Sequence, residues 1–497
     1  MTDIPSVQSE AVRLPVQTVR HPLPNTEPLS AYLALSGHFG RDEVYLLESA
    51  SGPARDCRYQ FLGFGLLLSV AVSHNVVRVE GEPALRDAVL ANVGPLLDAV
   101  DGELRLRSPR DLWQVLRAVR STFDAPGSAS RFEFGFLGYF GYDTAHYIEE
   151  LPFVIDGVSG RPDVELQLYQ GCVVADLTTG GAELLLHESS AWSPLDPGVI
   201  TTLLAGAASA HPLPEIEIDL IPEAVVGDDT SREQYLANVE RCMKHIAIGD
   251  IYQVQIGHEL NITSPIDPLV VYQRLRTRNA SPYMYLTTVE KHTVIGASPE
   301  LFVRVEDGLV TMRPIAGTSP RGAEDDEVVA ERLRTDPKEL AEHAMLVDLC
   351  RNDIGRICQA DTLAVPDKMV VESYSHVLHL VSTVTGEAEE DKDTFDIIAA
   401  LFPAGTMTGT PKIRAMEIIE AVERTRRGLY AGALGLIDVG GYVNLALCIR
   451  TLIHNDGSYR TRSSAGIVAD SVAEREWIET MAKSSAAYWA VTGKELL

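Results

Sequence analysis

Glu339 and Glu342 form a pair of carboxylates three residues apart in the segment DPKELAEH, residues 336–343. Asp336 is expected to cap a helix that begins at Pro337, and residues at i and i+3 lie on the same face of a helix. Carboxylate oxygens are the ligands that hard divalent cations prefer. The pair therefore predicts a candidate cation site, although Glu339 also stands where a capping-box glutamate would.

A second predicted helix carries another pair of this kind. In SVAEREWIETMAK, Ser471 and Glu474 have the spacing of a capping box at the helix start. Glu476, Glu479 and Lys483 then fall within about 60° of one another at about 100° per residue. A solvated charged stripe is one interpretation of this face. The other is two more metal-binding carboxylates, with a lysine beside them for an anionic substrate.

Two further segments hold residues suited to anion binding or catalysis. The loop FPAGTMTGTPK, residues 402–412, precedes a predicted helix, and its backbone N–H groups could surround an anion. A simple helix-entry turn is the alternative. His376 and His379 alternate with apolar residues in YSHVLHL, so in a regular strand they face opposite sides and share no metal. Either histidine could be structural or a base near neutral pH.

These residues must be positioned by larger elements, and the pattern predicts an α+β fold of large, mostly antiparallel β-sheets packed in a sandwich with helices on the outside. Residues 1–207 read mainly as short β-rich runs separated by turn residues. Residues 208–230 are rich in proline and acids and are interpreted as a linker. Residues 231–497 alternate strands and helices, with a hairpin turned at Asp307-Gly308.

Composition narrows the class of protein. The 497 residues carry 42 Lys and Arg against 70 Asp and Glu, a net charge of −28, which disfavours nucleic acid and anionic membranes as partners. Six cysteines without a CxxC pair, no signal-peptide pattern and no apolar run of about 18 residues predict a cytoplasmic protein. An anionic substrate would then need a local group of arginines, lysines or a bound cation.

Several segments together resemble the chorismate-utilising enzymes, and most closely the large subunit (component I) of anthranilate synthase. The resemblance spans about residues 30–490. It is carried by RPIAGTSPRG (313–322), DPKELAEHAMLVDLCRND (336–353), ESYSHVLHLVSTVTG (372–386), FPAGTMTGTPKIRAMEII (402–419), RRGLYAGALG (426–435), IRTLI (449–453) and AGIVADSVAEREWIETMAK (465–483).

The resemblance implies a Mg²⁺-dependent enzyme with chorismate as substrate. In the family, Mg²⁺ lies between the two glutamate-bearing helices and holds the ring carboxylate of chorismate. That role falls on Glu342 and Glu479, with Glu339 and Glu476 close by, and Lys483 would lie at the Mg²⁺ end of the site.

Other roles carry over from the same motifs. Glu300 in ASPELF matches the general acid that protonates the departing hydroxyl, and His379 matches the catalytic histidine near the ring. Thr318 would lie beside the ring, and Arg450 and Tyr430 would hold the pyruvyl carboxylate. The other substrate-binding positions that the resemblance implies are Gly466, Ala316, Gly317, Gly405 and Thr406.

Two positions sort the branches of the family. Gln253 stands where isochorismate and salicylate synthases carry a water-activating lysine, which favours ammonia as the nucleophile. Ala316 stands where aminodeoxychorismate synthases read PIKGT. The expected reaction is therefore ammonia addition at ring C2, loss of the C4 hydroxyl and elimination of pyruvate to give anthranilate, as in tryptophan biosynthesis.

Alternatives remain beside this expectation. One is an aminodeoxychorismate or 2-amino-2-deoxyisochorismate synthase of a folate or secondary-metabolite pathway, and a weaker one is a non-catalytic regulatory homologue. No glutaminase segment is visible, so the resemblance implies that a separate glutamine amidotransferase subunit supplies ammonia, in a homo- or hetero-oligomer.

Some segments depart from the family pattern. AGAGIV becomes SSAGIV, NMDTAIAIRT becomes YVNLALCIRT, and LSQR becomes IGHE with His258 and Glu259. Ala280 replaces the first proline of the NPSPYM effector motif. These changes are compatible with a pathway-specific enzyme that stops at the aminated intermediate or makes a related aminobenzoate. The retained effector-pocket positions are Glu48, Ser49, Asn279, Ser281, Tyr283 and Met284.

Overall fold

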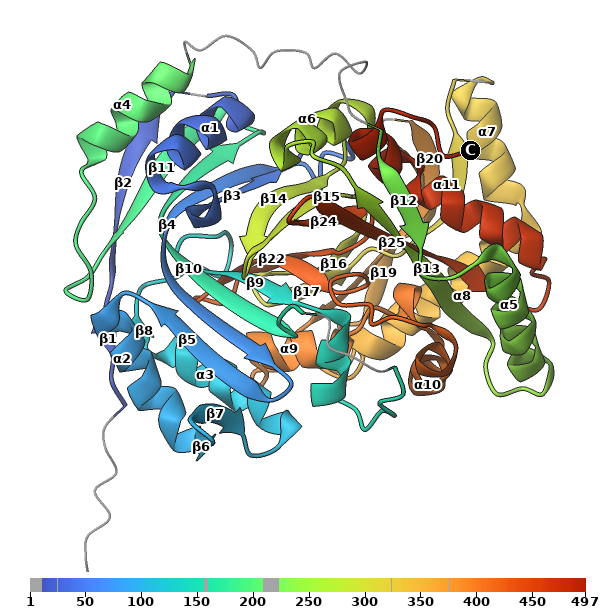
Figure 1. Ribbon diagram of the computed structural model, residues 1–497, viewed down its shortest axis with the longest axis horizontal. Helices are drawn as coiled ribbons and strands as arrows, with labels where there is room; N and C mark the ends of the chain where they lie inside the picture. The colour runs from blue at the N-terminus through green and yellow to red at the C-terminus, as the bar shows by residue number, and fades with distance from the viewer. Residues whose placement is uncertain (1–10, 25, 156–159, 209–222, 323, 375) are drawn as a thin grey trace, which may run out of the picture.

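A computed structural model describes residues 11–24, 26–155, 160–208, 223–322, 324–374 and 376–497. Strands fill the centre of the molecule and helices cover its outside (Figure 1). Nearly all strand pairs are antiparallel, the exception among the described pairings being a short parallel pair, Leu14–Pro15 with Phe123–Asp124. This arrangement agrees with the predicted α+β class.

The sheet of the N-terminal half is built on two long strands. β4 (Tyr59–Ser73) and β10 (Val164–Asp176) run antiparallel along almost their whole lengths. Both strands consist mostly of apolar residues and are buried on both faces, as expected for central strands. β11 (Gly181–Glu188) and β2 (Gln17–Leu23) extend this sheet toward α1 (Pro28–Phe39) and α4 (Pro197–Ala208).

The two halves of the chain share this sheet system. β9 (Gly135–Phe140) pairs on one side with β10 and on the other with β22 (Ala433–Asp438). β3 (Val44–Glu48) likewise pairs with β14 (Tyr283–Val289). Every residue of β9 is buried, because both of its edges and both of its faces are covered. Hydrogen bonding is thus continuous from the first half into the second.

The connection predicted over residues 208–230 is only partly described, since residues 209–222 lie outside the described residues. Beyond them, β12 (Val225–Asp228) pairs with β13 (Gln253–Thr263). The division into residues 1–207 and 231–497 therefore stays a prediction.

The sheet of the C-terminal half positions the candidate site. β13 pairs with β25 (Ser458–Ile467) and, at its first residues, with β21 (Gly409–Thr410). β20 (Val377–Glu387) pairs with β17 (Leu309–Met312), β18 (Ile315–Pro320) and β19 (Ala364–Ser373). β15 (His292–Ser298) and β16 (Leu301–Glu306) flank Glu300.

Helices that pack on this second sheet lie at the right of Figure 1. They include α5 (Arg232–Ala247), α8 (Pro337–Ile354), α10 (Lys412–Val422) and α11 (Ala473–Thr492). None of the helices in the described residues is long and apolar enough to span a membrane. All six cysteines are free thiols.

Local sequence signals set most of the boundaries. The Asp336 carboxylate accepts hydrogen bonds from Lys338 N at 2.8 Å and Glu339 N at 3.3 Å, which confirms the predicted cap of α8. Asp307 and Gly308 both have positive φ, as the tight turn between β16 and β17 requires.

The predicted capping box at Ser471 is wrong. α11 is capped by Val472 without a side-chain bond, and Ser471 Oγ instead accepts from Val468 N at 3.0 Å. Glu474 pairs with Arg232 of α5. Ser471 lies one residue before the cap position and bonds within the turn that precedes α11.

Candidate active site

The four glutamates of α8 and α11 lie opposite one another. Burial raises the pKa of Glu339, and the charges of Glu342 and of Glu479 on the other helix raise it further. Burial also raises the pKa of Glu476, with Glu479 and then Glu342 of α8 adding to it. The carboxylates of the two helices are therefore close enough to repel one another, although they come from segments about 140 residues apart in the chain.

Two lysines partly balance this negative charge. Lys338 Nζ lies 3.4 Å from Glu342 Oε1, and Lys483 Nζ lies 2.6 Å from Glu479 Oε1. Glu342 is partly exposed and the Glu479 side chain is 47% exposed, so both can reach solvent. Glu476 is buried beside them.

This cluster suits a cation that needs few protein ligands. Among the described residues, no three His, Cys, Asp or Glu side chains are gathered closely enough to form a complete metal site. Mg²⁺ keeps several waters and typically uses one or two carboxylates together with substrate oxygens. Burial is the main cause of the raised pKa of both Glu339 and Glu476, and the neighbouring carboxylates add to it. A bound divalent cation would favour the charged form of these groups.

Arg450 supplies a positive group without an acid partner. Its Nη1 donates to the carbonyl of Lys483 at 2.7 Å, and the guanidinium pairs with no carboxylate in the part of the chain that the structure describes. Burial lowers the pKa of Arg450, while the nearby Tyr430 and Glu479 act against that shift. A buried guanidinium of this kind favours an anionic ligand. Its φ of 52° turns the backbone at this point.

Tyr430 belongs to a hydrogen-bonded network behind Arg450. Tyr430 Oη lies 2.6 Å from Ser464 Oγ, and Ser464 Oγ donates to Gln255 Oε1 at 3.0 Å. The carbonyl of Ser464 accepts from Lys483 Nζ at 2.9 Å. Ser464 of β25 thus contacts side chains from β13, from α11 and from the turn that precedes β22.

Gly466 lies against two amides of the neighbouring strand. A Cβ at this position would stand 2.8 Å from Gln253 Nε2 and 3.0 Å from Gln255 Nε2. Gln253 and Gln255 share a face of β13 because side chains alternate along a strand. Gln253, which stands at the family's water-activating position, is thereby brought next to Gly466.

Glu300 is a buried carboxyl near Lys483. Burial raises the pKa of Glu300 to about 8, although Thr406 and the charge of Lys483 act against this shift. Glu300 therefore carries a proton at neutral pH and can act as an acid. The Thr406 hydroxyl is buried and, within the described residues, has no partner with good hydrogen-bond geometry. Gly405 packs against Leu349 of α8, where a Cβ would clash at 1.9 Å.

His379 lies on β20 opposite Thr318. Its Nδ1 is 3.0 Å from Thr318 Oγ1 and 3.4 Å from the carbonyl of Gly317. Burial lowers the pKa of His379 to about 4, with the charge of Arg450 contributing, so the ring is neutral at pH 7. Gly317 has a φ of +57°, and a Cβ there would meet Glu339 Oε2 at 3.0 Å. β18 therefore lies between His379 and the glutamates of the carboxylate cluster and contacts both.

The structure brings the predicted active-site residues into one region of the second sheet. Charge effects connect Lys483 with Glu300 and connect Arg450 with His379, Tyr430 and Glu479. Ala316 pairs with Leu380 in the same β18–β20 ladder. Sequence reasoning assigned no role to Ser464 or Gln255. The replacement of AGAGIV by SSAGIV was the one available signal for Ser464.

Four of the six positions predicted for an effector pocket line a separate cavity. Glu48, Ser49, Tyr283 and Met284 line it together with Asn444. Glu48 is buried and accepts from Tyr272 Oη and from Arg276 Nη2, the latter at 2.8 Å. Asn279 and Ser281 stand outside its lining and are bonded to each other, Ser281 Oγ donating to Asn279 O at 2.9 Å.

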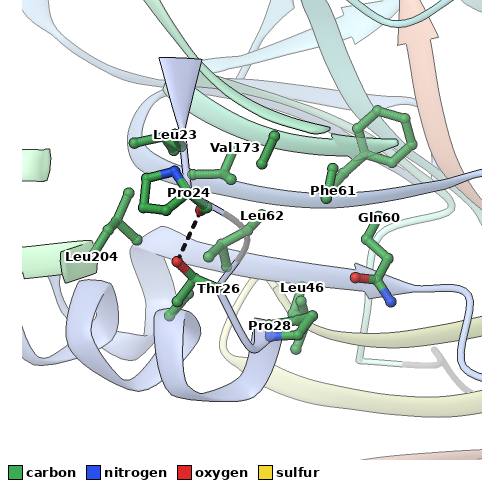
Figure 2. A pocket seen from close by; sticks show the side chains of 13 residues that line it. Leu23, Pro24, Thr26, Pro28, Leu46, Gln60, Phe61, Leu62, Val173 and Leu204 are labelled. Atoms are coloured by element: carbon green, nitrogen blue, oxygen red, sulfur yellow. Dashed lines mark hydrogen bonds between the residues drawn. The ribbon is translucent and has the colours of Figure 1, made fainter. Parts of the chain in front are cut away.

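A second cavity lies away from the carboxylate helices, among α1, α4 and the strands of the N-terminal half (Figure 2). Its walls are mostly apolar, as Leu46, Phe61 and Val173 show. Thr26 Oγ1 donates to Pro24 O at 3.2 Å and so points no free group into it. This cavity has no residues suited to the chemistry considered above.

Known proteins resemble this chain along its whole length. The family of chorismate binding enzymes matches residues 92–488. The 2-amino-4-deoxychorismate synthase of Streptomyces globisporus is 64% identical over 498 residues, covering 100% of both chains. Anthranilate synthase component 1 of Pseudomonas putida is 37% identical over 93% of this chain and 92% of its own.

A solved structure shows the same fold. The crystal structure of anthranilate synthase component I from Streptococcus pneumoniae TIGR4 superposes with a TM-score of 0.70 at 29% identity, covering 87% of this chain and 92% of that chain. The predicted fold class is thereby confirmed.

Proposed function

This chain belongs to the chorismate binding enzyme family, and from that premise we propose that it adds ammonia to chorismate and releases 2-amino-4-deoxychorismate. The observation that carries this proposal is the 64% identity, over the full length of both chains, to the synthase of that name from Streptomyces globisporus. The anthranilate synthases are 35–37% identical.

This identity corrects the sequence-based expectation of anthranilate as the product. The proposed roles of the motifs common to both branches are substrate binding and loss of the C4 hydroxyl. Both branches need these steps, so the motifs do not distinguish release of the aminated intermediate from its conversion to anthranilate. The departures in SSAGIV and YVNLALCIRT were the sequence signal for the branch that stops early.

The proposed reaction makes one bond and breaks one. Ammonia forms a bond to C2 of the ring, the two ring double bonds shift, and the C4–O bond breaks. Glu300, which is protonated at neutral pH, gives its proton to the departing hydroxyl so that water leaves. Neutral His379 can take up the proton that the new amine sheds. The enolpyruvyl ether stays on the ring.

Binding of the substrate's two carboxylates is assigned to separate groups. Arg450, which has no acid partner among the described residues, would hold the pyruvyl carboxylate next to Tyr430. Glu342 and Glu479, with Glu339 and Glu476, would hold Mg²⁺ at the ring carboxylate. When bound, Mg²⁺ would supply a Lewis acid that orients the ring and withdraws electrons from it. Thr318, Gly317 and Thr406 would line the space between these two groups in the proposed site.

Ammonia is proposed to come from a separate glutamine amidotransferase subunit. No glutaminase motif was found in the sequence, and the family match takes up residues 92–488. The isolated chain should therefore use ammonium salts but not glutamine.

The test is incubation of the purified chain with chorismate, Mg²⁺ and ammonium, with products identified by mass and fluorescence. The expected product has the mass of chorismate plus ammonia minus water and is not anthranilate. Ammonium should be replaceable by glutamine only after an amidotransferase is added. Release of one pyruvate per chorismate consumed, or turnover of glutamine by the pure chain, would contradict the proposal.

A further inference from the structure

The Ser464 hydroxyl is enclosed between two polar side chains of the proposed site. Its Oγ lies 2.6 Å from Tyr430 Oη and 3.0 Å from Gln255 Oε1, and the residue is 1% exposed. Ser464 faces the site because it pairs with Gly257 on β13, two register positions from the Gln255–Gly466 pair.

The hydrogens in this chain of contacts can be assigned by counting. A serine hydroxyl has one hydrogen, and here Ser464 Oγ donates it to Gln255 Oε1. The short contact with Tyr430 must then use the phenolic hydrogen, with Ser464 Oγ as the acceptor. The chain of donors runs from Tyr430 to Ser464 to Gln255. Tyr430 is left with lone pairs only for any other neighbour.

We propose that Ser464 determines the product by withholding the Tyr430 hydrogen from the enolpyruvyl ether. This inference rests on the proposed function, which places the pyruvyl group near Arg450 and Tyr430. Tyr430 is close enough to Arg450 to affect the pKa of the guanidinium. Ser464 acts as a positioning residue, since it works through the direction of the phenol hydrogen.

The step that this arrangement suppresses is elimination of the side chain. In that step the C2 hydrogen leaves as a proton to solvent, its bonding electrons form the C2–C3 double bond, and the C3–O bond breaks. The ring becomes aromatic, and the electron pair stays on the enolpyruvate oxygen. A hydrogen-bond donor at that oxygen would stabilise the departing charge, and one such donor is typically worth about 100-fold in rate.

The experiment isolates this second step by supplying the purified amination product to the enzyme and measuring anthranilate and pyruvate. Ser464→Gly frees the phenolic hydrogen, so we expect about a 100-fold faster release of anthranilate. Ser464→Ala removes the same hydroxyl and serves as the second variant if glycine disturbs β25. The double variant Ser464→Gly with Tyr430→Phe should lose the gained elimination.

A matched control is available one residue away. Ser463 faces the other side of β25, where its Oγ donates to Thr480 O at 2.7 Å and accepts from Ser484 Oγ at 2.9 Å. Ser463→Ala should leave the product ratio unchanged, and a shift as large as that of the Ser464 variants would overturn the inference.

Two other outcomes are decisive. Folded Ser464→Gly and Ser464→Ala enzymes that aminate chorismate but still release no anthranilate would overturn the role of Ser464 and leave the proposed function standing. Anthranilate as the main product of the unmodified chain would instead refute the proposed function and, with it, this inference.

Discussion

Glu300 keeps its proton because burial outweighs the attraction of Lys483. A carboxyl with a pKa of about 8 is largely protonated at neutral pH, which suits an acid that must protonate a leaving hydroxyl. A protein normally avoids such a group because its charged form is poorly solvated inside. The presence of the buried Glu300 carboxyl is consistent with a role in the reaction.

We expect amination to fall as the pH rises through about 8, when rates are normalised to un-ionised ammonia. Glu300 then loses the proton that the hydroxyl needs. Glu300→Gln should reduce turnover by about 100-fold or more, because general acid catalysis typically contributes that much. Steady-state rates from pH 6 to 9 measure this, and an unchanged rate in Glu300→Gln would contradict the assignment.

The raised pKa of Glu300 also predicts how the free energy of unfolding depends on pH. The pKa of Glu300 is raised from 4.5 in the unfolded reference to about 8, so its contribution is full below 4.5 and is lost as the pH rises through 8. The unfolding free energy of the native chain should therefore decline relative to that of Glu300→Gln between pH 5 and 9. Urea titrations at several pH values provide the comparison, and parallel curves for the two proteins would argue against a raised pKa.

Gly466 leaves room for the side-chain amides of Gln253 and Gln255. Gly466→Ala would force the amides of Gln253 and Gln255 to move, because the new Cβ would lie 2.8 and 3.0 Å from them. A displacement near 1 Å in an active site can cost about 100-fold, so kcat/KM for chorismate should drop by that order. Gly227→Ala on β12 is the control, since its Cβ meets nothing within 4 Å. Equal losses in both variants would show a general packing effect instead.

At the scale of elements, α8 and α11 act as a pair. Each helix presents glutamates one turn apart, and the pKa shifts of Glu339 and Glu476 show that the two faces interact. Ser463 Oγ bonds to Thr480 O at 2.7 Å, and His258 Nε2 lies 2.8 Å from Thr480 Oγ1. These contacts attach α11 to the strands that carry Gln255 and Ser464.

We expect activity to require Mg²⁺ and to be lost in excess chelator. Glu342→Gln and Glu479→Gln should each raise the Mg²⁺ concentration for half-saturation by at least about tenfold, measured by calorimetric titration as well as by rate. Glu474→Gln, also on α11 but paired with Arg232, should leave Mg²⁺ binding unchanged. Full turnover in excess chelator would contradict the proposed requirement for Mg²⁺.

On the scale of the whole molecule, the two halves form one hydrogen-bonded system. β9 contributes to both, since it pairs with β10 and with β22. Side chains add to this continuity, because Arg117 of α3 (Leu112–Ser121) contacts Asp393 at 2.6 Å at the start of α9 (Thr394–Leu401). Neither half can complete its sheet without strands from the other.

The chain should therefore unfold in one cooperative transition. Its four tryptophans allow a test by halves, with Trp113 and Trp192 in the first and Trp477 and Trp489 in the second. A variant with Trp113→Phe and Trp192→Phe reports only the second half, and one with Trp477→Phe and Trp489→Phe reports only the first. In each variant, fluorescence and far-UV circular dichroism should give the same urea midpoint. Separate midpoints would mean that the halves unfold independently.

Features that depend on near neighbours or on shared motifs could be predicted from the amino-acid sequence. The cap at Asp336, the turn at Asp307-Gly308 and the pairing of glutamates within each helix follow from contacts within a few residues, so local rules predict them. The motif set likewise indicated the family, and the fold with it. It also placed Glu300, Arg450 and His379 among the candidates, but without their surroundings.

The surroundings of those candidates could not be predicted in this way, because they depend on how distant segments pack together. Burial sets the pKa of Glu300, and burial depends on segments far apart in the chain. The network of Tyr430, Ser464 and Gln255 joins residues separated by 34 and 209 positions, which no periodicity within one element can connect. The expected product was wrong because the motifs that suggested it are also present in a chain that is 64% identical to a 2-amino-4-deoxychorismate synthase, so those motifs alone do not separate the two products.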